Sequence, residues 1–375
     1  MIKRPLIVVV SLIGLLGMSV TVSAVASENG PLASTRQPAA TSIKLTWSAA
    51  FGPVPGAATT LPPAITVITF PGWKPAALVL WSGPSAGKLG NKISYVSATA
   101  SLSHNKWTAP ATVDNGKVFT DQGPAAAPYG APAGAPSRGH LLVAWKATGP
   151  TGKILYTVGT GLKTDGLSWG PAKAIPGATS ASAPALLSPM HSSTVIAAWR
   201  APGNQLTYVV GVVPPAPGAP IHWGNPATIS GARTTAAPAL AEANTGSHSG
   251  TVYLFWRTSS GRIERSSIPD PVPLHPTWTT PVAFPSSVKA GTGPAAASLG
   301  INYAYPLLVV YRAAQGSSLS YVQLPLSGKV TKPVTVPGLH SMVQPALGDP
   351  VLFVTESIKR LAFKLSKPCW WCDPH

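Results

Sequence analysis

Residues 169–210 read WGPAKAIPGATSASAPALLSPMHSSTVIAAWRAPGNQLTYVV and hold the clearest copy of a unit that recurs along the chain. The unit opens with Trp and reaches the Ala of a Pro-Ala pair sixteen to eighteen residues later. An apolar segment ending in an aromatic and a basic residue follows, and a Gly-containing turn then leads to a segment that carries Tyr. Short apolar segments separated by Gly and Pro turns indicate an all-β chain.

Five units share this pattern, and a sixth, less regular copy follows them. The opening tryptophans are Trp47, Trp107, Trp169, Trp223 and Trp278. Each apolar segment ends in an aromatic residue followed by Ser in the first unit and by Lys or Arg in the others. These segments are ALVLWS (77–82), LLVAWK (141–146), VIAAWR (195–200), VYLFWR (252–257) and LLVVYR (307–312). The Tyr-bearing segments include ISYV (93–96), ILYTV (154–158), LTYVV (206–210) and LSYVQ (319–323). The last copy holds QPAL (344–347), VLFVTE (351–356) and RLAFKL (360–365).

A period of 54 to 62 residues with about four strands in each unit fits the blade of a β-propeller. A chain of small β-sandwiches is the alternative, but a single unit is too small to bury its own faces. The segment IKLTW (43–47) precedes the first complete unit, while the last unit lacks a fourth strand. We therefore predict a six-bladed β-propeller over residues 43–368, closed by this N-terminal strand.

The N-terminus predicts export. Lys3 and Arg4 precede an apolar run from Leu6 to Val22, and Ala24-Val25-Ala26 supplies a signal-peptidase site. We expect residues 1–26 to be a signal peptide and residues 27–42 to be a flexible lead-in. No second apolar stretch of spanning length follows in the sequence, so the protein is predicted to be secreted and to lack a membrane span.

The tail, residues 369–375, contains Cys369 and Cys372 in a Cys-Trp-Trp-Cys motif. In an exported chain a local disulfide is the simplest interpretation, and free thiols are the alternative. A redox motif would need a βαβ setting, and a metal site with His375 would lack a fourth ligand. We predict no metal site and no cofactor.

The chain is basic, with 27 Lys and Arg against 10 Asp and Glu and a net charge of +17. Such a charge favours anionic partners. An excess spread evenly over the surface, or an acidic habitat, would also account for it. No Lys/Arg run indicates a specific nucleic-acid groove.

The head of one unit, Thr164-Asp165-Gly166-Leu167-Ser168-Trp169, resembles the Asp-box of sialidase-like propellers with one residue missing between Asp and Gly. The copies from Ser103 to Trp107 and from Leu274 to Trp278 keep only the Trp. The pattern is also similar to that of fungal and bacterial lectin propellers. The resemblance spans about residues 43–368 and implies sugar pockets between blades that use Trp, Tyr and Arg.

The resemblance to sialidases also implies a cage of three arginines, a Tyr nucleophile with a Glu partner and an Asp acid/base. The early Arg-Ile-Pro element of that family is absent, because Pro62 to Val67 contains no Arg. A glycosidase needs two carboxylates a set distance apart. The candidates share no recognisable motif, so catalysis stays open, and they are Asp114, Asp121, Asp165, Glu242, Glu264, Asp270, Asp349 and Glu356.

A basic residue closes the apolar segment in four successive units: Lys146, Arg200, Arg257 and Arg312. These cations could line a mouth that accepts anionic ligands, with Arg offering bidentate contacts. Alternatively, each covers the neighbouring Trp and donates to a loop carbonyl. Trp199 and Trp256 precede two of them and are candidate sugar-stacking residues, although a residue repeated in nearly every blade also suits a core position.

We therefore predict a secreted, lectin-like binding module that recognises a glycan or an anionic surface polymer through repeated sites. A glycoside hydrolase of the sialidase-like superfamily and a protein-binding adhesion scaffold are the alternatives. No oligomeric state follows from the pattern.

Overall fold

The computed structural model describes most of the repeat region. The described residues all belong to one compact unit of residues 40–374. They are residues 45–47, 54, 56–68, 76–85, 90–99, 107–129, 140–150, 152–163, 166–190, 192–214, 219–246, 249–299, 306–348, 351–357 and 360–367. The predicted signal peptide, lead-in and Cys-Trp-Trp-Cys tail lie outside them. Among the described residues, no helix has the length and apolar character needed to cross a membrane.

Five antiparallel sheets are each built from one continuous stretch of chain, in the order inner to outer strand. Blade 1 contains β2 (Ala64–Ile68), β3 (Ala76–Ser85), β4 (Asn91–Thr99), β5 (Ala111–Thr112) and β6 (Phe119–Thr120). Blade 2 contains β7 (Ala125–Tyr129), β8 (His140–Lys146), β9 (Gly152–Lys163), β10 (Gly166–Trp169) and β11 (Lys173–Ser180). Blade 3 contains β12 (Ala185–Leu187), β13 (Thr194–Arg200), β14 (Gln205–Val212), β15 (His222–Trp223) and β16 (Ala227–Arg233).

Blade 4 contains β17 (Ala239–Gly246), β18 (Ser249–Arg257), β19 (Ile263–Asp270) and β20 (Val282–Ala283). Blade 5 contains β21 (Ala295–Ser298), β22 (Leu307–Arg312), β23 (Ser318–Leu324) and β24 (Val334–His340). Each inner strand begins at the Ala of a Pro-Ala pair, because Pro has no N–H to donate to the sheet. The predicted apolar segments are found as the second strands of these units. Two short 3₁₀ segments, η3 (Val113–Gly116) and η4 (Pro202–Asn204), occupy turns.

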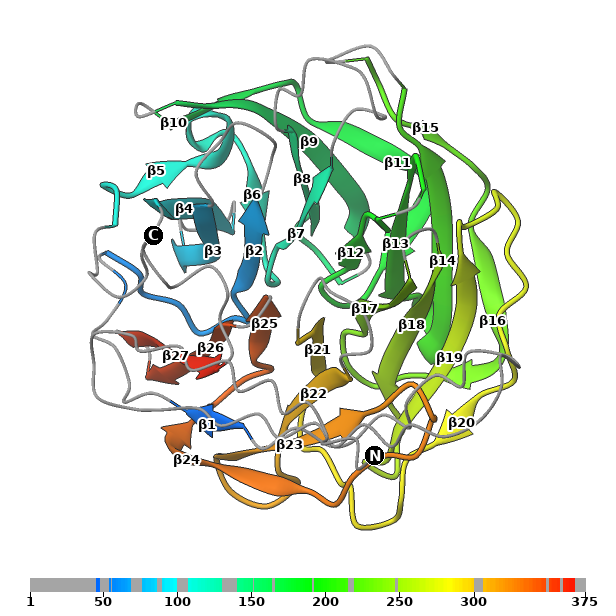
Figure 1. Ribbon diagram of the computed structural model, residues 1–375. Helices are drawn as coiled ribbons and strands as arrows, with labels where there is room; N and C mark the ends of the chain where they lie inside the picture. The colour runs from blue at the N-terminus through cyan, green and yellow to red at the C-terminus, as the bar shows by residue number, and fades with distance from the viewer. Residues whose placement is uncertain are drawn as a thin grey trace, which may run out of the picture. The chain divides into compact units, whose positions relative to one another are not determined.

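The remaining sheet joins the two ends of the repeat region. It contains β25 (Ala346–Gly348), β26 (Val351–Ser357), β27 (Arg360–Lys367) and β1 (Thr46–Trp47). Thr46 pairs with Lys367 and Trp47 with Ser366, so the predicted pairing of the N-terminal strand is observed. Figure 1 places the inner strands β2, β7, β12, β17, β21 and β25 around the centre, and β25 contacts both β2 and β21.

The predicted count of six blades needs correction to five. Five sheets are complete blades, each formed by a continuous unit whose side-chain packing is described. The sheet of β25, β26, β27 and β1 is a composite. Its inner strand has three residues, its outer strand has two and comes from the other end of the chain, and the side chains of β26 and β27 lie outside the described set. We therefore treat it as a closing sheet between blade 5 and blade 1.

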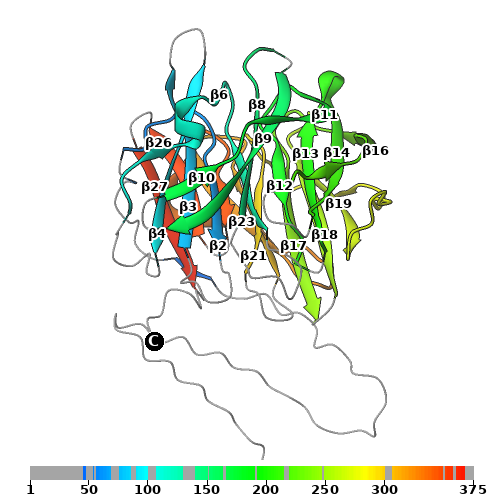
Figure 2. The same cartoon turned by 90° about the horizontal axis from the view of Figure 1, so that it is seen from above.

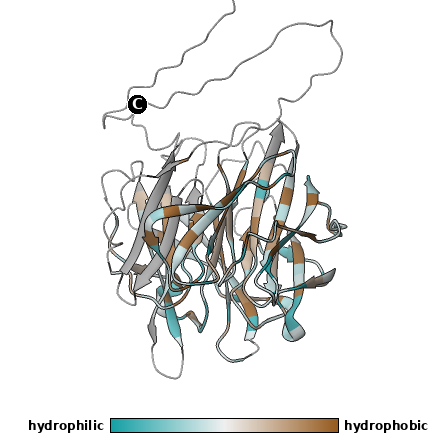
Figure 3. Cartoon of the chain, turned by 90° about the horizontal axis from the view of Figure 1, so that it is seen from below, coloured by the Kyte–Doolittle hydropathy of each residue, from teal (hydrophilic) through white to brown (hydrophobic). Residues whose placement is uncertain are grey.

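Apolar side chains fill the seams between neighbouring blades. One cluster joins Leu142 and Ile154 of blade 2 to Val195 and Trp199 of blade 3, and equivalent clusters occupy the other described seams. Figure 2 shows that the strands of neighbouring sheets run in similar directions, and Figure 3 shows hydrophobic bands along them. A fully buried aromatic residue in such a seam contributes several kcal/mol, since Trp→Ala in a core costs about 3–5 kcal/mol.

The outer strands of three blades share a glycine kink. Gly177, Gly231 and Gly338 all have φ between +58° and +74°. The register of the outer strand shifts at each of these places. Only glycine adopts this conformation without strain, so the kink steers the chain toward the next inner strand.

Candidate functional site

The described blades present one end at which their second strands finish, and we call this end the basic face. Lys146, Arg200, Arg257 and Arg312 are the last residues of β8, β13, β18 and β22. Each pairs with a residue at the start of the third strand, so the four residues occupy equivalent places in their blades. The register of the sheets therefore places the four residues at like positions, and their role toward a ligand stays a prediction.

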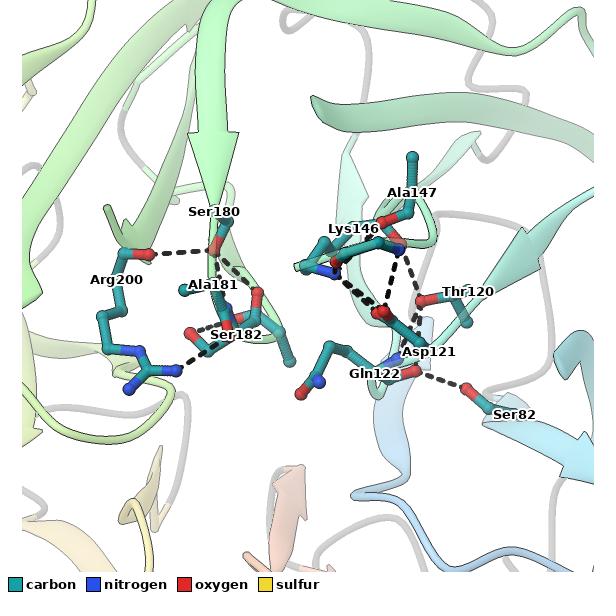
Figure 4. Close-up of polar contacts among 12 residues, drawn as sticks. Ser82, Thr120, Asp121, Gln122, Lys146, Ala147, Ser180, Ala181, Ser182 and Arg200 are labelled. Carbon is teal, nitrogen blue, oxygen red and sulfur yellow. Dashed lines mark hydrogen bonds and ion pairs between the residues drawn. The ribbon is translucent and has the colours of Figure 1, made fainter. Parts of the chain in front are cut away.

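A buried hydroxyl organises the turn that enters each inner strand except β21 of blade 5. It stands four residues before the Pro of the Pro-Ala pair and is at most 4% exposed, in Thr59, Thr120, Ser180, Thr234 and Ser341. Thr120 Oγ1 accepts from Gln122 N at 3.1 Å and donates toward Lys146 O at 2.8 Å (Figure 4). Ser180 and Thr234 bond in the same way to the Arg200 and Arg257 carbonyls, at 3.1 Å and 3.2 Å. Sequence reasoning missed this position, although its fixed offset from Pro-Ala was a usable signal.

Lys146 is neutralised within the blade. Its side chain is 2% exposed, and Nζ lies 2.7 Å and 2.9 Å from the two carboxylate oxygens of Asp121. The ammonium also donates to the carbonyls of Ala147 and Gly149, and the Asp121 carboxylate accepts from Gly149 N (Figure 4). A buried cation needs such partners because desolvation is costly. Lys146 thus fixes a turn and has little surface to offer a ligand.

Arg200 bridges two turns. Its Nη2 donates to Ala181 O at 2.8 Å, and its Nη1 donates to Thr235 O at 3.2 Å. Ala181 lies before the inner strand of its own blade, whereas Thr235 lies before that of blade 4. Ser82 holds the equivalent place in blade 1 and donates to Gln122 O, in the turn entering blade 2, at 2.6 Å (Figure 4).

Arg257 and Arg312 are half-buried and use only part of their hydrogen-bonding capacity. Arg257 Nε donates to Ala290 O and Nη1 donates to Thr235 Oγ1, both at 2.6 Å. Arg312 Nη2 donates to Gly291 O at 3.3 Å. Arg257 Nη2 and Arg312 Nη1 have no hydrogen-bond acceptor among the described residues.

Trp199 and Trp256 lie in the core. They are 1% and 0% exposed, as are the equivalent Trp81 and Trp145 at 1% each, so their rings present no face to solvent. Three of the head tryptophans also serve packing, because each of these makes an edge-to-face contact with a Tyr of the preceding blade. These pairs are Tyr95–Trp169, Tyr156–Trp223 and Tyr208–Trp278, with ring centroids 5.5 to 5.6 Å apart.

Comparison with solved structures identifies the fold. The chain is similar to the NanB sialidase of Streptococcus pneumoniae, at 11% identity over 84% of this chain and 69% of the sialidase, with a TM-score of 0.55. It is similar to the intramolecular trans-sialidase of Ruminococcus gnavus, at 10% identity over 84% and 95% of the two chains, with a TM-score of 0.52. The chain has a sialidase-like β-propeller fold. The Aleuria aurantia lectin also matches this propeller, at 17% identity over 74% and 78% of the chains, with a TM-score of 0.49. No family model and no curated protein matches the sequence.

The carboxylates of this sialidase-like propeller are dispersed over the described blades. Glu242 and Asp270 lie close enough for Asp270 to raise the pKa of Glu242, and they are 8% and 2% exposed. They lie away from the basic face, since they pair with residues near the start of β18 whereas Arg257 ends that strand. The other candidates do not join them: Asp121 bonds Lys146, Asp114 lies in η3 and Glu264 lies in β19, while Asp165, Asp349 and the Glu356 side chain fall outside the described set.

Metal and disulfide chemistry concern other parts of the chain. Within the described ranges, no group of three or more His, Cys, Asp or Glu side chains is placed to bind a metal ion. Cys369 and Cys372 lie beyond those ranges, so the disulfide stays a prediction.

Proposed function

We propose that this protein is a binding module for a glycan or another anionic surface polymer, and that the basic face carries its ligand site. The supporting observation is the pair of half-buried arginines, Arg257 and Arg312, which repeat at equivalent places and keep N–H groups unused by described residues. A guanidinium group fixed by the fold suits a carboxylate or sulfate, because its geometry is set before the ligand arrives. The net charge of +17 would also attract anions over longer range.

The exposed surface favours acidic over neutral sugars. The large exposed apolar residues among those described are Met190, Leu274, Val282, Val334 and Met342, none of them aromatic. Binding of a neutral sugar commonly uses stacking on an exposed ring, and here the repeated rings are occupied in packing. Charge is therefore the main source of affinity in this proposal. The sialidases that share the fold make glycans the first ligands to test.

A hydrolase is a weaker candidate. Glycoside hydrolysis requires two carboxyl groups that reach the substrate. In the described part of the chain, the Glu242–Asp270 pair is buried and lies away from the basic face. We also propose that the protein is exported, with residues 1–26 as its signal peptide, because an extracellular location would expose it to surface polymers.

Binding to immobilised glycans tests the proposal. The purified protein is applied to an array of neutral, carboxylated and sulfated glycans at low and at physiological salt. We expect retention on the acidic glycans that weakens as salt screens the charges. Absence of binding to every acidic glycan at low salt would refute the proposed function. Release of a sugar product from the array would instead support the hydrolase.

A further inference from the structure

Four basic residues gather where blade 4 meets blade 5 at the basic face, around the loop of residues 289–291. We call this group the basic seam, and it consists of Arg257, Arg262, Lys289 and Arg312. The loop is held from both sides: Ala290 N donates to Gly261 O of blade 4, and Gly291 N donates to Arg312 O of blade 5, both at 2.8 Å. Figure 1 shows β18 and β22, which end in two of these residues, in neighbouring blades.

The inner two guanidinium groups lie on consecutive carbonyls of the loop. Arg257 reaches Ala290 O from blade 4, and Arg312 reaches Gly291 O from blade 5. Gly291 is required for this arrangement, since a Cβ there would lie 2.9 Å from Arg312 Nη2 and 2.8 Å from Ala313 O. Two cations are therefore brought to neighbouring peptide groups of one loop.

The outer two cations extend the seam toward the rim of blade 4. Arg262 and Lys289 form a backbone bridge with each other, and both are exposed. Arg262 Nη2 donates to Phe284 O at 3.3 Å. The Lys289 ammonium has no hydrogen-bond acceptor in the part of the chain that the structure describes.

No described carboxylate forms an ion pair with any of the four. The ion pair found among the described residues joins Lys146 to Asp121, in blade 2. The positive charges of these neighbouring side chains repel one another, and the neutral carbonyls that they contact offset the repulsion only in part. The fold thus maintains a concentration of positive charge at this seam that packing alone does not require.

We propose that the basic seam binds an acidic polysaccharide through its carboxylate or sulfate groups, with Arg257 and Arg312 as the inner contacts and Arg262 and Lys289 as the outer ones. This inference rests on the function proposed above and locates its site. A polysaccharide fits better than a nucleic acid, because sequence-independent binding of single strands combines cations with exposed aromatic rings. The described exposed residues include no Trp, Tyr or Phe.

Dextran sulfate and neutral dextran of equal length are suitable probes for the intact protein. The test variant is Arg262→Gln/Lys289→Gln, which removes two exposed charges and leaves the Arg257 and Arg312 contacts in place. Its matched control is Lys329→Gln/Lys332→Gln, which removes two exposed charges from blade 5. These lysines follow Leu324, which pairs with Leu307 at the end of the blade opposite to Arg312.

We expect the seam variant to bind dextran sulfate about tenfold more weakly at low salt, a loss of about 1.4 kcal/mol, and the control to bind within about twofold of the wild type. Arg312→Gln should weaken binding further, with circular dichroism used to verify folding. Equal losses in the seam variant and the control would overturn the seam assignment while leaving the proposed function intact. Wild-type protein that binds dextran sulfate no better than neutral dextran would remove both. Equally tight binding of a single-stranded oligonucleotide, with the same dependence on the seam, would overturn the polysaccharide assignment.

Discussion

Glu242 on β17 and Asp270 at the end of β19 meet beside β18, where Gly250 leaves room for them. A Cβ at Gly250 would lie 2.6 Å from Glu242 Oε1. Met190 N donates to Glu242 Oε2 at 2.8 Å, and the Ser192 hydroxyl donates to Asp270. Because Met190 and Ser192 belong to blade 3, these carboxyl groups join blade 3 to blade 4.

This environment makes the stability of the propeller depend on pH. Burial raises the pKa of Glu242 to about 8 from its ordinary value of 4.5; the Met190 N–H lowers the pKa and the Asp270 carboxylate raises it. Between pH 4.5 and about pH 8, the Glu242 carboxyl is ionised in the unfolded chain but keeps its proton in the folded chain. The free energy of unfolding is therefore highest below about pH 4.5, falls as pH rises, and levels off above about pH 8. At about 1.4 kcal/mol for each pKa unit, the loss is on the order of 5 kcal/mol.

Urea unfolding followed by Trp fluorescence, from about pH 4.5 to pH 9, measures this effect in the wild type and in Glu242→Gln. The amide keeps an acceptor for Met190 N and cannot ionise. The difference between the two proteins isolates Glu242 from His140, whose pKa is lowered by burial. We expect the variant to become the more stable protein by several kcal/mol near pH 8. Glu264→Gln, at a half-buried position of β19, is the matched control. A wild type and a Glu242→Gln variant with parallel pH profiles would refute the reasoning.

Three further changes test the turns of the basic face by urea unfolding. Thr234→Val removes the buried hydroxyl while keeping the side-chain shape and should cost about 1–3 kcal/mol, because it leaves a backbone N–H without its acceptor; Thr228→Val, on the exposed face of β16, should change stability by less than about 0.5 kcal/mol. Asp121→Asn leaves the Lys146 ammonium buried without a counter-charge and should cost about 1.5–3 kcal/mol, since Asp121 itself is partly exposed. Adding Lys146→Met should recover part of the loss, and a double variant no more stable than the single one would contradict this. Gly231→Ala meets open space but requires φ of +74°, so it should cost about 1 kcal/mol.

The strands could be predicted because their packing leaves a local signal. Val195 to Trp199 are all buried, which explains the continuous apolar run that marks β13. The Ala after the Pro of each Pro-Ala pair begins an inner strand because Pro has no N–H to donate to the sheet. By contrast, β19 reads IERSSIPD and carries little hydrophobic pattern. Its pairing with β18 along eight residues is what defines it, and such pairing is not visible in the segment itself.

The side-chain partners at the candidate site could not be read from the sequence. Arg257 bonds to Ala290, 33 residues away, through a carbonyl oxygen that every residue type possesses. Trp199 and Trp256 illustrate the converse, since both a sugar-binding surface and a core favour Trp, and only their burial distinguishes the two. The five-blade count likewise depends on how the last strands are assembled, which the repeat pattern alone did not determine.

The basic seam coincides with a departure from the repeat. At the entrance to the inner strand, the described units carry a buried hydroxyl, but the fifth has Ala290. There Arg257 Nε donates to the Ala290 carbonyl, so a guanidinium contact holds a turn that a hydroxyl holds elsewhere. The bond from Gly291 N to the Arg312 carbonyl is common to the repeat, because Ala181 N and Thr235 N bind the Arg200 and Arg257 carbonyls in the same way. Packing would be served by the common arrangement, as it is in blades 2, 3 and 4. Natural folds depart from local regularity mainly at functional sites, and this departure lies where cations without an ion-pair partner among the described residues gather. It therefore supports the proposed ligand site. The same reasoning explains why Lys146, which keeps both the hydroxyl and a carboxylate partner, is a structural residue in an equivalent position.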